Sequence, residues 1–292
     1  MTNTTQSPTY AVTGATGGLG RGIVTSLLER GVDPAHVVAV VRDPAKAADL
    51  ADRGVALRVG DYDRPDTLAT AFEGVDVLVL VSGSDPGKRI PQHTAAIEAA
   101  TAAGVGRIVY TSAPQADTSS FSLVDDHRAT EELLQTTTVT YTVLRNNWYV
   151  ENYTRDLDAL LARGSAIGSA HDGLVGVALR ADYAEAAAAA ALESGHQNAT
   201  YELAGPLVTL AQFYAALSEA AGKPVVYVDL STEDHLAALL DAGLPDPVAG
   251  FVVSIDTAIA NGELATAPDD LARLLGRPAT PLDDALRVVL KG

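Results

Sequence analysis

The stretch that decides the fold is Thr13-Gly14-Ala15-Thr16-Gly17-Gly18-Leu19-Gly20, which follows a short apolar run and precedes a segment of helical period. Gly14, Gly17 and Gly20 stand three apart. A pyrophosphate requires a tight turn, a backbone without side chains and a helix start with free N–H groups, and this order of elements supplies all three. We therefore expect a dinucleotide at this turn, the alternative being an ordinary glycine-rich turn.

Short β-branched runs alternate with longer stretches of helical period in the first half of the chain. This alternation predicts an α/β fold, a Rossmann-type doubly wound parallel sheet with helices on both faces. The run over residues 55–59 alternates apolar and polar residues, which indicates an edge strand. The strand order 3-2-1-4-5-6 follows, with ligands beyond the carboxyl ends of strands one and four. The expected strands are residues 10–13, 37–41, 55–59, 75–81, 107–111 and 140–144.

The second half of the chain alternates less regularly. We expect Asp182 to cap an alanine-rich helix over residues 183–192, and strands over 201–203 and 225–228. The predicted organisation is a disordered lead over residues 1–8 and a nucleotide-binding domain over residues 9–150. A smaller mixed α/β substrate lobe follows over residues 151–292, with elements that return to the first domain.

Composition excludes several classes of function. The 292 residues hold 37 acidic and 20 basic side chains, a net charge of −17 that repels nucleic acid. Cysteine is absent, so no thiolate metal site can form, and the scattered histidines predict no metal ligands. No apolar stretch approaches the roughly 20 residues that span a bilayer. We expect a cytoplasmic protein with a small-molecule partner, and leave a homodimer open.

Arg42 directly follows the second strand, where NAD-binding folds usually carry an acid for the ribose hydroxyls. A guanidinium forks onto phosphate oxygens, so this position favours the 2′-phosphate of NADPH, with Lys46 as a looser contact. Asp43 as a ribose acceptor is the alternative.

Together with the glycine turn, further motifs occur in order along the chain. With these motifs the chain resembles the NmrA-like branch of the atypical short-chain dehydrogenases, and most closely its NADPH-dependent quinone oxidoreductases and triphenylmethane-dye reductases. The likeness runs from Tyr10 to about Leu290. The motifs are Val41-Arg42-Asp43-Pro44, Gly60-Asp61-Tyr62, Ile108-Val109-Tyr110-Thr111-Ser112, Leu144-Arg145-Asn146-Asn147-Trp148-Tyr149 and Leu275-Gly276-Arg277-Pro278.

The resemblance implies a set of cofactor contacts. The glycine turn would hold the pyrophosphate, Arg42 the 2′-phosphate and Asp61 the adenine side. Ser82 and Gly83 would pass along the nicotinamide ribose, and the segment from Asn146 to Asn152 would form a wall for nicotinamide and substrate. The implied cofactor residues are Gly14, Thr16, Gly17, Gly18, Leu19, Gly20, Arg42, Asp61, Ser82, Gly83 and Asn147.

Ketone-reducing members of the wider group carry a Tyr-x-x-x-Lys pair, and this chain has His127 and Glu131 at the corresponding places. Quinone reduction needs less help from an acid, because hydride reaches an electron-poor ring. His127 can donate the proton with Glu131 as its orienting partner one helical turn away, or the two form a surface pair without chemistry.

The segment after the sixth strand supplies the other candidates. Tyr149 and Tyr153, four residues apart on an expected helix, can form an aromatic wall with Trp148 and Asn152 for a flat substrate, the alternative being ordinary core packing. Asn146 and Asn147 can hydrogen-bond a carboxamide or a quinone oxygen. The candidate catalytic residues are therefore His127, Tyr149 and Asn146, and the candidate substrate contacts are Trp148, Asn152 and Tyr153.

Three functions agree with these residues. The first is an NADPH-dependent oxidoreductase that passes hydride to a quinone or a similar electron-poor aromatic acceptor. The second is reduction of triphenylmethane dyes by the same step. The third is a non-enzymatic NADP(H)-binding redox sensor of the NmrA type.

Overall fold

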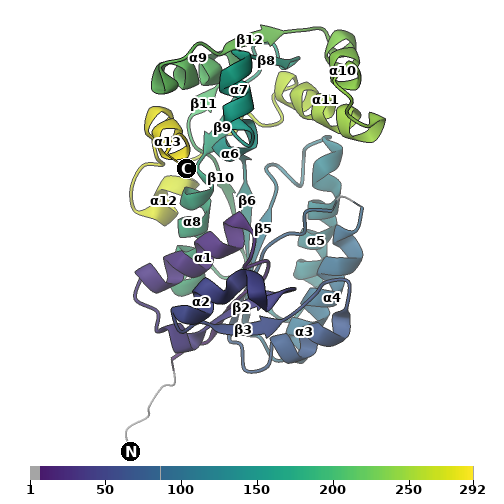
Figure 1. The fold of residues 1–292 in the computed structure, drawn as a ribbon. Coiled ribbons are helices and arrows are strands. Elements are labelled where there is room, and N and C mark those ends of the chain that lie inside the picture. The colour runs from purple at the N-terminus through teal and green to yellow at the C-terminus, as the bar shows by residue number, and fades with distance from the viewer. Residues whose placement is uncertain (1–6, 86, 292) are drawn as a thin grey trace, which may run out of the picture.

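The computed structural model describes residues 7–85 and 87–291 (Figure 1). The predicted lead over residues 1–8 lies outside them apart from Ser7 and Pro8, which are exposed. Within the described residues, no helix combines the length and apolar character needed to cross a membrane. The same ranges hold no cluster of three or more His, Asp or Glu side chains suited to a metal ion.

A seven-stranded sheet forms the centre of the larger part of the molecule, in the order β10-β6-β5-β4-β1-β2-β3, and every pairing is parallel. The predicted order 3-2-1-4-5-6 is confirmed, with one further strand beyond the sixth. The predicted edge position of the third strand is confirmed as well. The strands are β1 (Tyr10–Val12), β2 (Val37–Val41), β3 (Ala56–Val59), β4 (Val77–Leu80), β5 (Arg107–Ser112), β6 (Thr140–Asn146) and β10 (Ala199–Leu203).

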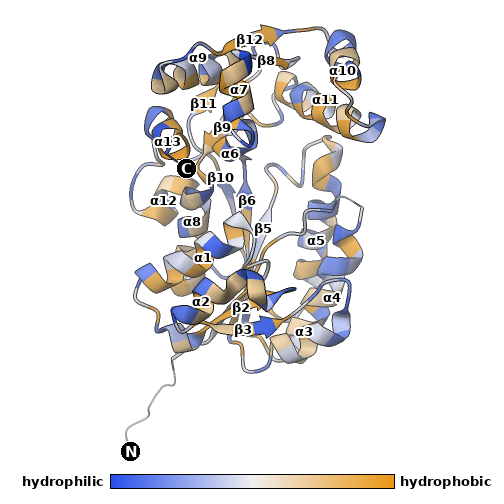
Figure 2. Ribbon diagram, in the orientation of Figure 1, coloured by the Kyte–Doolittle hydropathy of each residue, from blue (hydrophilic) through white to orange (hydrophobic). Residues whose placement is uncertain are grey.

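Helices cover both faces of this sheet, because successive strand residues point to opposite sides and both sides are apolar. One face carries α1 (Gly18–Glu29), α2 (Ala48–Asp52), α8 (Arg180–Leu192) and α12 (Asp270–Leu275). The other carries α3 (Pro65–Ala71), α4 (Arg89–Ala102) and α5 (Asp125–Thr136). Figure 2 shows hydrophilic and hydrophobic residues mixed on α4 and α5, as expected where only one side of a helix meets a core. Short 3₁₀ turns are η1 (Pro34–His36), η2 (Pro44–Ala47) and η3 (Ser122–Val124).

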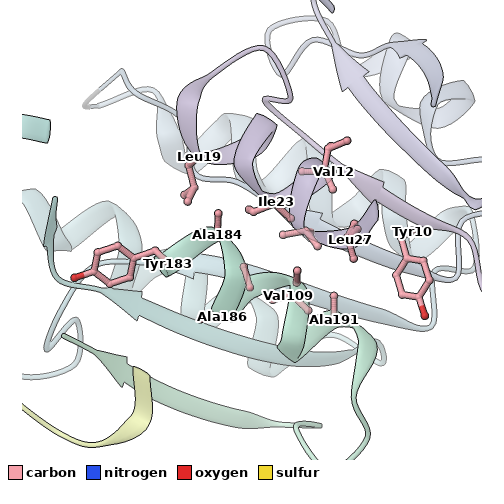
Figure 3. Packing of buried hydrophobic residues seen from close by; sticks show 14 of the residues in the cluster. Tyr10, Val12, Leu19, Ile23, Leu27, Val109, Tyr183, Ala184, Ala186 and Ala191 are labelled. Carbon is pink, nitrogen blue, oxygen red and sulfur yellow. The ribbon is translucent and has the colours of Figure 1, made fainter. Parts of the chain in front are cut away.

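The alanine-rich helix α8 packs closely on α1, with Ala184 facing Leu19 and Ile23 (Figure 3). A Cβ at Gly22 of α1 would lie 2.9 Å from the Cβ of Ala184. Small side chains on both helices therefore allow this close approach, as the alanine content predicts.

The predicted capping role of Asp182 is wrong, because α8 begins at Arg180, three residues before the expected start, with Leu179 at its N-cap. The buried Asp182 carboxylate instead accepts hydrogen bonds from the guanidinium of Arg277 and from the backbone N–H and hydroxyl of Thr280. It thereby fixes the chain between α12 and the last helix. Partners this distant in sequence carry no local signal.

The second part of the molecule lies beyond the carboxyl ends of the strands (Figure 1) and has its own apolar core. Its sheets are β11-β9-β7 and β12-β8. The predicted strand over residues 225–228 is confirmed as β12. The elements are β7 (Trp148–Tyr149), α6 (Val150–Tyr153), α7 (Leu157–Arg163), β8 (Ser165–Gly168), β9 (Val175–Ala178), β11 (Leu207–Val208), α9 (Leu210–Ala221), β12 (Val226–Asp229), α10 (Thr232–Asp241), α11 (Asp246–Ala260) and α13 (Leu282–Val289).

Candidate functional site

A cavity of about 510 Å³ lies at the carboxyl ends of β1, β2, β3 and β4. Doubly wound folds bind their ligands at these carboxyl ends of the strands. All the cofactor residues expected from the sequence line it, except Asn147. The lining residues are Thr13, Gly14, Thr16, Gly17, Gly18, Leu19, Gly20, Val40, Arg42, Lys46, Gly60, Asp61, Tyr62, Asp63, Val81, Ser82, Gly83, Ser84, Asp85 and Gln92.

The glycine turn closes tightly at one wall of the cavity. Gly14 has a φ of +59°, a left-handed conformation that favours glycine, and its carbonyl accepts the Gly17 N–H at 2.8 Å. A Cβ at Gly20 would lie 2.4 Å from the Gly14 oxygen, so the turn admits no side chain there. Helix α1 begins without a side-chain cap and without an acid in its first turn. Its first N–H groups are thus available to an anion, which fits a diphosphate.

Arg42 supplies positive charge at the wall that follows β2. Its side chain is exposed and makes no hydrogen bond or ion pair with other described residues, and Lys46 lines the same wall. The alternative acceptor Asp43 is not part of the lining, and its carboxylate accepts the Ala45 N–H at 3.0 Å. The geometry therefore favours Arg42 and fits a further phosphate on this side.

Tyr62 lines the cavity, although the sequence patterns did not predict it as a site residue. Its hydroxyl lies 2.6 Å from the Thr13 Oγ1 and 2.8 Å from the Val81 carbonyl, so it ties the strand ends of β1 and β4 together. Asp61 beside it accepts the Asp63 N–H at 3.1 Å. The Gly60-Asp61-Tyr62 motif was the available signal, but it does not reveal the partner of the phenol.

Two side chains of α4 hold the backbone of Gly83 in place. Its N–H donates to the Nε2 of His93 at 3.0 Å, and its carbonyl accepts from the Arg89 Nε at 2.7 Å. Because Nε2 accepts, the proton sits on Nδ1, which lies 2.9 Å from the Thr130 hydroxyl. Burial lowers the pKa of His93 to about 4, so the imidazole stays neutral and keeps this acceptor.

His127 lies in the core between β5 and α5 and does not line the cavity. Its Nδ1 lies 2.8 Å from the Tyr110 hydroxyl, and burial lowers the pKa of His127 to about 3. The predicted pairing with Glu131 is wrong. The Glu131 carboxylate instead accepts from Arg145 at 2.6 Å and from the Ser112 hydroxyl at 2.5 Å. A buried cation captures this carboxylate because an unpaired charge in the core is costly.

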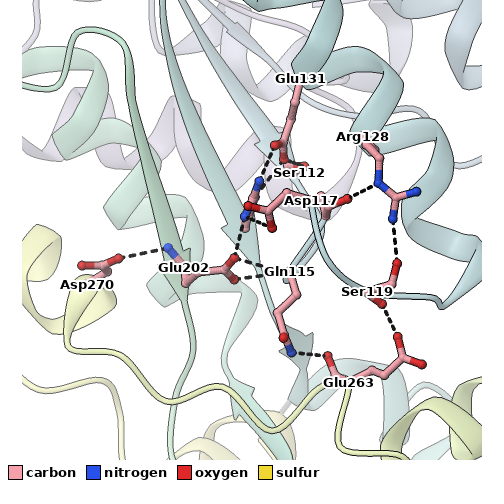
Figure 4. Close-up of polar contacts among 11 residues, drawn as sticks. Ser112, Gln115, Asp117, Ser119, Arg128, Glu131, Glu202, Glu263 and Asp270 are labelled. Carbon is pink, nitrogen blue, oxygen red and sulfur yellow. Dashed lines mark hydrogen bonds and ion pairs between the residues drawn. The ribbon is translucent and has the colours of Figure 1, made fainter.

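Figure 4 shows the polar network that continues from this ion pair. Arg145 also donates to Glu202 at 3.0 Å, and Glu202 accepts the Gln115 N–H. The Gln115 amide in turn donates to the Glu263 carbonyl at 2.8 Å. The Glu263 carboxylate binds the turn at residues 119–121, including the Ser120 N–H at 2.8 Å. The loop after β5 is thereby attached to the second part of the molecule.

Asn146 ends β6 and Tyr149 lies three residues later in β7, and neither belongs to the cavity lining. The Asn146 Nδ2 donates to the Tyr149 hydroxyl at 3.3 Å, and burial raises the pKa of that phenol. The Oδ1 of Asn146 has no partner among the described residues. Asn147 is used differently: its Nδ2 donates to the Leu264 carbonyl and the Thr266 hydroxyl, and its Oδ1 accepts the Trp148 N–H.

The expected aromatic wall is divided between two places. Tyr149 belongs to β7 rather than to a helix and packs edge-on against Tyr183, with ring centres 5.1 Å apart. Tyr153, at the end of α6, packs against Phe213 at 5.0 Å within the core of the second part. A shared helical face for the two tyrosines is therefore wrong.

Trp148 and Asn152, expected beside the two tyrosines, also lie outside the cavity lining. Trp148 packs on the core of the second part. Its Nε1 and the Tyr153 hydroxyl are buried without a partner in the described chain. Asn152 is exposed.

Comparisons with known proteins agree with this geometry. The family model described as NAD(P)H-binding matches residues 14–194. The chain is 44% identical to quinone oxidoreductase 2 of Escherichia coli, over 94% of this chain and 96% of that protein. It is 30% identical to an NAD(P)H azoreductase of Xenophilus azovorans, over 92% and 93% of the two chains.

Solved structures extend the likeness to the whole fold. The Escherichia coli NADPH-dependent quinone oxidoreductase in complex with NADPH has a TM-score of 0.91 at 44% identity, covering 96% of this chain and 99% of that one. The triphenylmethane reductase of Citrobacter sp. with NADP(H) has a TM-score of 0.90 at 38% identity, covering 96% and 100%. Since the family model spans more than half of the chain and the first relative is matched almost end to end, this chain belongs to the NAD(P)H-binding family.

Proposed function

We propose that this protein is an NADPH-dependent oxidoreductase that transfers hydride to a quinone or a similar electron-poor aromatic acceptor. The observation that carries the proposal is one cavity with two places for phosphate. The uncapped start of α1 forms one, and the guanidinium of Arg42, which has no partner among the described residues, forms the other. The likeness to a quinone oxidoreductase and a triphenylmethane reductase supports the choice of acceptor.

The cofactor is held, in this proposal, by the residues that line the cavity. The N–H groups of Gly18 and Leu19 bind the diphosphate, Arg42 binds the 2′-phosphate, and Asp61 lies on the adenine side. Ser82 and Gly83 lie along the nicotinamide ribose, where the neutral His93 fixes the course of the backbone. Asn147 is the least favoured contact, since its amide already binds the protein.

When bound, NADPH supplies a hydride, and solvent supplies one proton for each quinone reduced to hydroquinone. Tyr149 is the proposed donor of that proton to the acceptor, and solvent then returns a proton to its phenolate. Burial raises its pKa, so the phenol is protonated at neutral pH. Asn146 donates its own N–H to the phenol oxygen and so leaves the phenol hydrogen free to reach the acceptor. Asn146 orients this donor rather than supplying the proton.

His127 takes no part in this route. Its imidazole is buried in the core beside Tyr110, and burial lowers its pKa to about 3, so it is neutral and holds no imidazolium proton to give. Glu131 stands where ketone-reducing members carry a lysine. Its carboxylate accepts from Arg145 and Ser112 and supplies no positive charge to assist ketone reduction. An electron-poor ring suits this site better than a ketone, because the developing phenolate is a weak base that needs little acid assistance.

The experiment follows NADPH absorbance after addition of p-benzoquinone or a triphenylmethane dye, with nucleotide binding measured separately by calorimetry. Consumption of NADPH well above the protein-free rate is the expected result. Binding without consumption across several acceptors would leave a redox sensor as the function. Absence of heat with both NADPH and NADH would overturn the assignment of the cavity as well.

A further inference from the structure

We propose that Arg180, at the start of α8, is a second cationic ligand for the cofactor diphosphate and meets it from the side opposite Arg42. This inference rests on the proposed nucleotide site and extends it to a residue from the second half of the chain. Arg180 does not belong to the glycine motif, and its distance in sequence, 162 positions after Gly18, hides it from motif analysis.

The close approach of Arg180 to Gly18 is the first observation. A Cβ built on Gly18 would lie 2.9 Å from the Nη1 of Arg180 and 3.0 Å from its Cδ. The Cα–Cβ direction in a helix tilts toward the N-terminus, so the guanidinium lies beside the first turn of α1. That turn carries the free N–H groups that face the cavity. Gly18 lacks a side chain at the place that the guanidinium occupies.

The starts of α1 and α8 lie next to each other and differ in their charge partners. At α8, the Arg180 N–H donates to both carboxylate oxygens of Glu151, each at 3.1 Å. At α1, neither a capping side chain nor an acid is present in the first turn. The anion that satisfies the start of α8 is thus part of the protein, whereas the corresponding anion at α1 has to come from a ligand.

The guanidinium of Arg180 makes no hydrogen bond or ion pair within the described ranges of the chain, although acids outnumber bases 37 to 20 overall. A cation beside a helix N-terminus is repelled by the helix dipole. This arrangement becomes favourable when an anion lies between the two, because both then attract it. A diphosphate satisfies the N–H groups and the guanidinium together.

Tyr149 holds Arg180 in this position. The guanidinium carbon lies 5.3 Å from the centre of the Tyr149 ring, a cation–π distance. The proposed proton donor and the proposed diphosphate ligand therefore contact each other. Binding at Arg180 thus restrains the ring on which proton donation depends, which links nucleotide binding to the acceptor side.

The experiment measures dissociation constants by calorimetry for three probes: NADPH, NADH, which lacks the 2′-phosphate, and 2′-AMP, which lacks the diphosphate. Arg180→Met keeps the apolar stem against Tyr149 and removes the charge. We expect its Kd to rise about tenfold for both NADPH and NADH and to stay unchanged for 2′-AMP. Arg42→Gln is the matched control and should weaken NADPH and 2′-AMP while leaving NADH unchanged.

Arg180→Lys keeps a positive charge but loses the fork, so its Kd for NADH should rise less than in Arg180→Met. If Arg180→Met does not fold, Arg180→Lys serves as the test alone. A Kd for NADH in Arg180→Lys equal to that of the wild type would then overturn the proposal. A folded Arg180→Met with wild-type Kd values, or with only the KM of the acceptor altered, would also overturn it. Wild-type protein that binds neither nucleotide would instead refute the proposed function itself.

Discussion

In the proposed site, the choice between NADPH and NADH depends on one side chain, that of Arg42. The protein carries a net charge of −17, which repels a phosphate at long range. A local guanidinium overcomes this because charge-assisted hydrogen bonds act at contact distance and depend little on remote charges. Asp43 next to it does not line the cavity and accepts the Ala45 N–H, so this acid does not compete with Arg42 there.

Arg42→Gln should therefore change the ratio of NADPH to NADH affinity. We expect the Kd for NADPH to rise about 10- to 100-fold, the value of one or two hydrogen bonds to a charged group, with NADH unaffected. Fluorescence titration of both nucleotides measures this. Arg53→Gln is the control, because Arg53 is an exposed arginine that donates to Thr25 outside the cavity. An equal loss for both nucleotides would contradict the assignment of Arg42 to the 2′-phosphate.

Tyr149→Phe tests the proton donor. Removal of the hydroxyl should lower kcat with a weakly electron-poor acceptor on the order of 10²-fold, the lower range for a positioned acid. The loss should shrink with strongly electron-poor quinones, since water then suffices. Steady-state kinetics with a series of quinones gives the comparison, and Tyr141→Phe on β6 is the matched control. A loss of the same size for every quinone would argue for a purely structural role of the phenol.

At the scale of elements, the contact between α1 and α8 sets the position of the glycine turn. Gly18 approaches Arg180, and four residues later Gly22 approaches Ala184, so one face of α1 lies against one face of α8. A side chain at Gly22 would push α1 away from α8, because the Cβ of Ala184 cannot move aside, whereas one at Gly18 would displace the Arg180 side chain. Because α1 begins at the phosphate turn, such a shift also moves the N–H groups of the cavity.

Gly22→Ala should lower the free energy of unfolding by about 1 kcal/mol or more, since overpacking outweighs the gain in helix propensity. It should also weaken NADPH binding through the movement of α1. Gly250→Ala in α11 is the matched control: a Cβ there meets nothing within 4 Å, so we expect a gain of about 0.5–1 kcal/mol. Urea unfolding of the two variants measures both values. Stabilisation by Gly22→Ala would refute the proposed tight contact.

The sequence predicts those elements whose pattern is local. The glycine turn, the strand order and the edge position of β3 follow from periodicity and from the chirality of parallel crossovers. The roles of Asp182 and Glu131 do not, because their partners, Arg277 and Arg145, come from distant segments. The location of Arg180 beside Gly18 is likewise a product of packing between helices. Sequence patterns rank such polar residues as caps or surface groups and cannot identify their long-range partners.

At the scale of the whole molecule, polar groups connect the two parts. The Glu263 carboxylate anchors the loop after β5, and the Arg145–Glu131 ion pair lies beneath it. His93 and His127 are buried between β5 and the helices α4 and α5, on the same face of the strand as this ion pair, and stay neutral, because burial lowers both pKa values far below that of a free imidazole. These histidines therefore make the stability of the fold depend on pH.

Acidification should destabilise the protein through His127. Its pKa is about 3 in the folded state and about 6.5 when unfolded, so below pH 6.5 the unfolded chain binds a proton that the native state excludes. The contribution of neutral His127 to the free energy of unfolding is fully present above pH 6.5. It falls by up to about 1.4 kcal/mol per pH unit below pH 6.5. His127→Asn cannot titrate, and its amide can still hydrogen-bond Tyr110. Relative to pH 7, we expect wild type to lose about 2–3 kcal/mol more than this variant by pH 4.5, measured by urea unfolding. Above pH 6.5 the two stability curves should run parallel, and parallel curves down to pH 4.5 would show that native His127 accepts a proton freely.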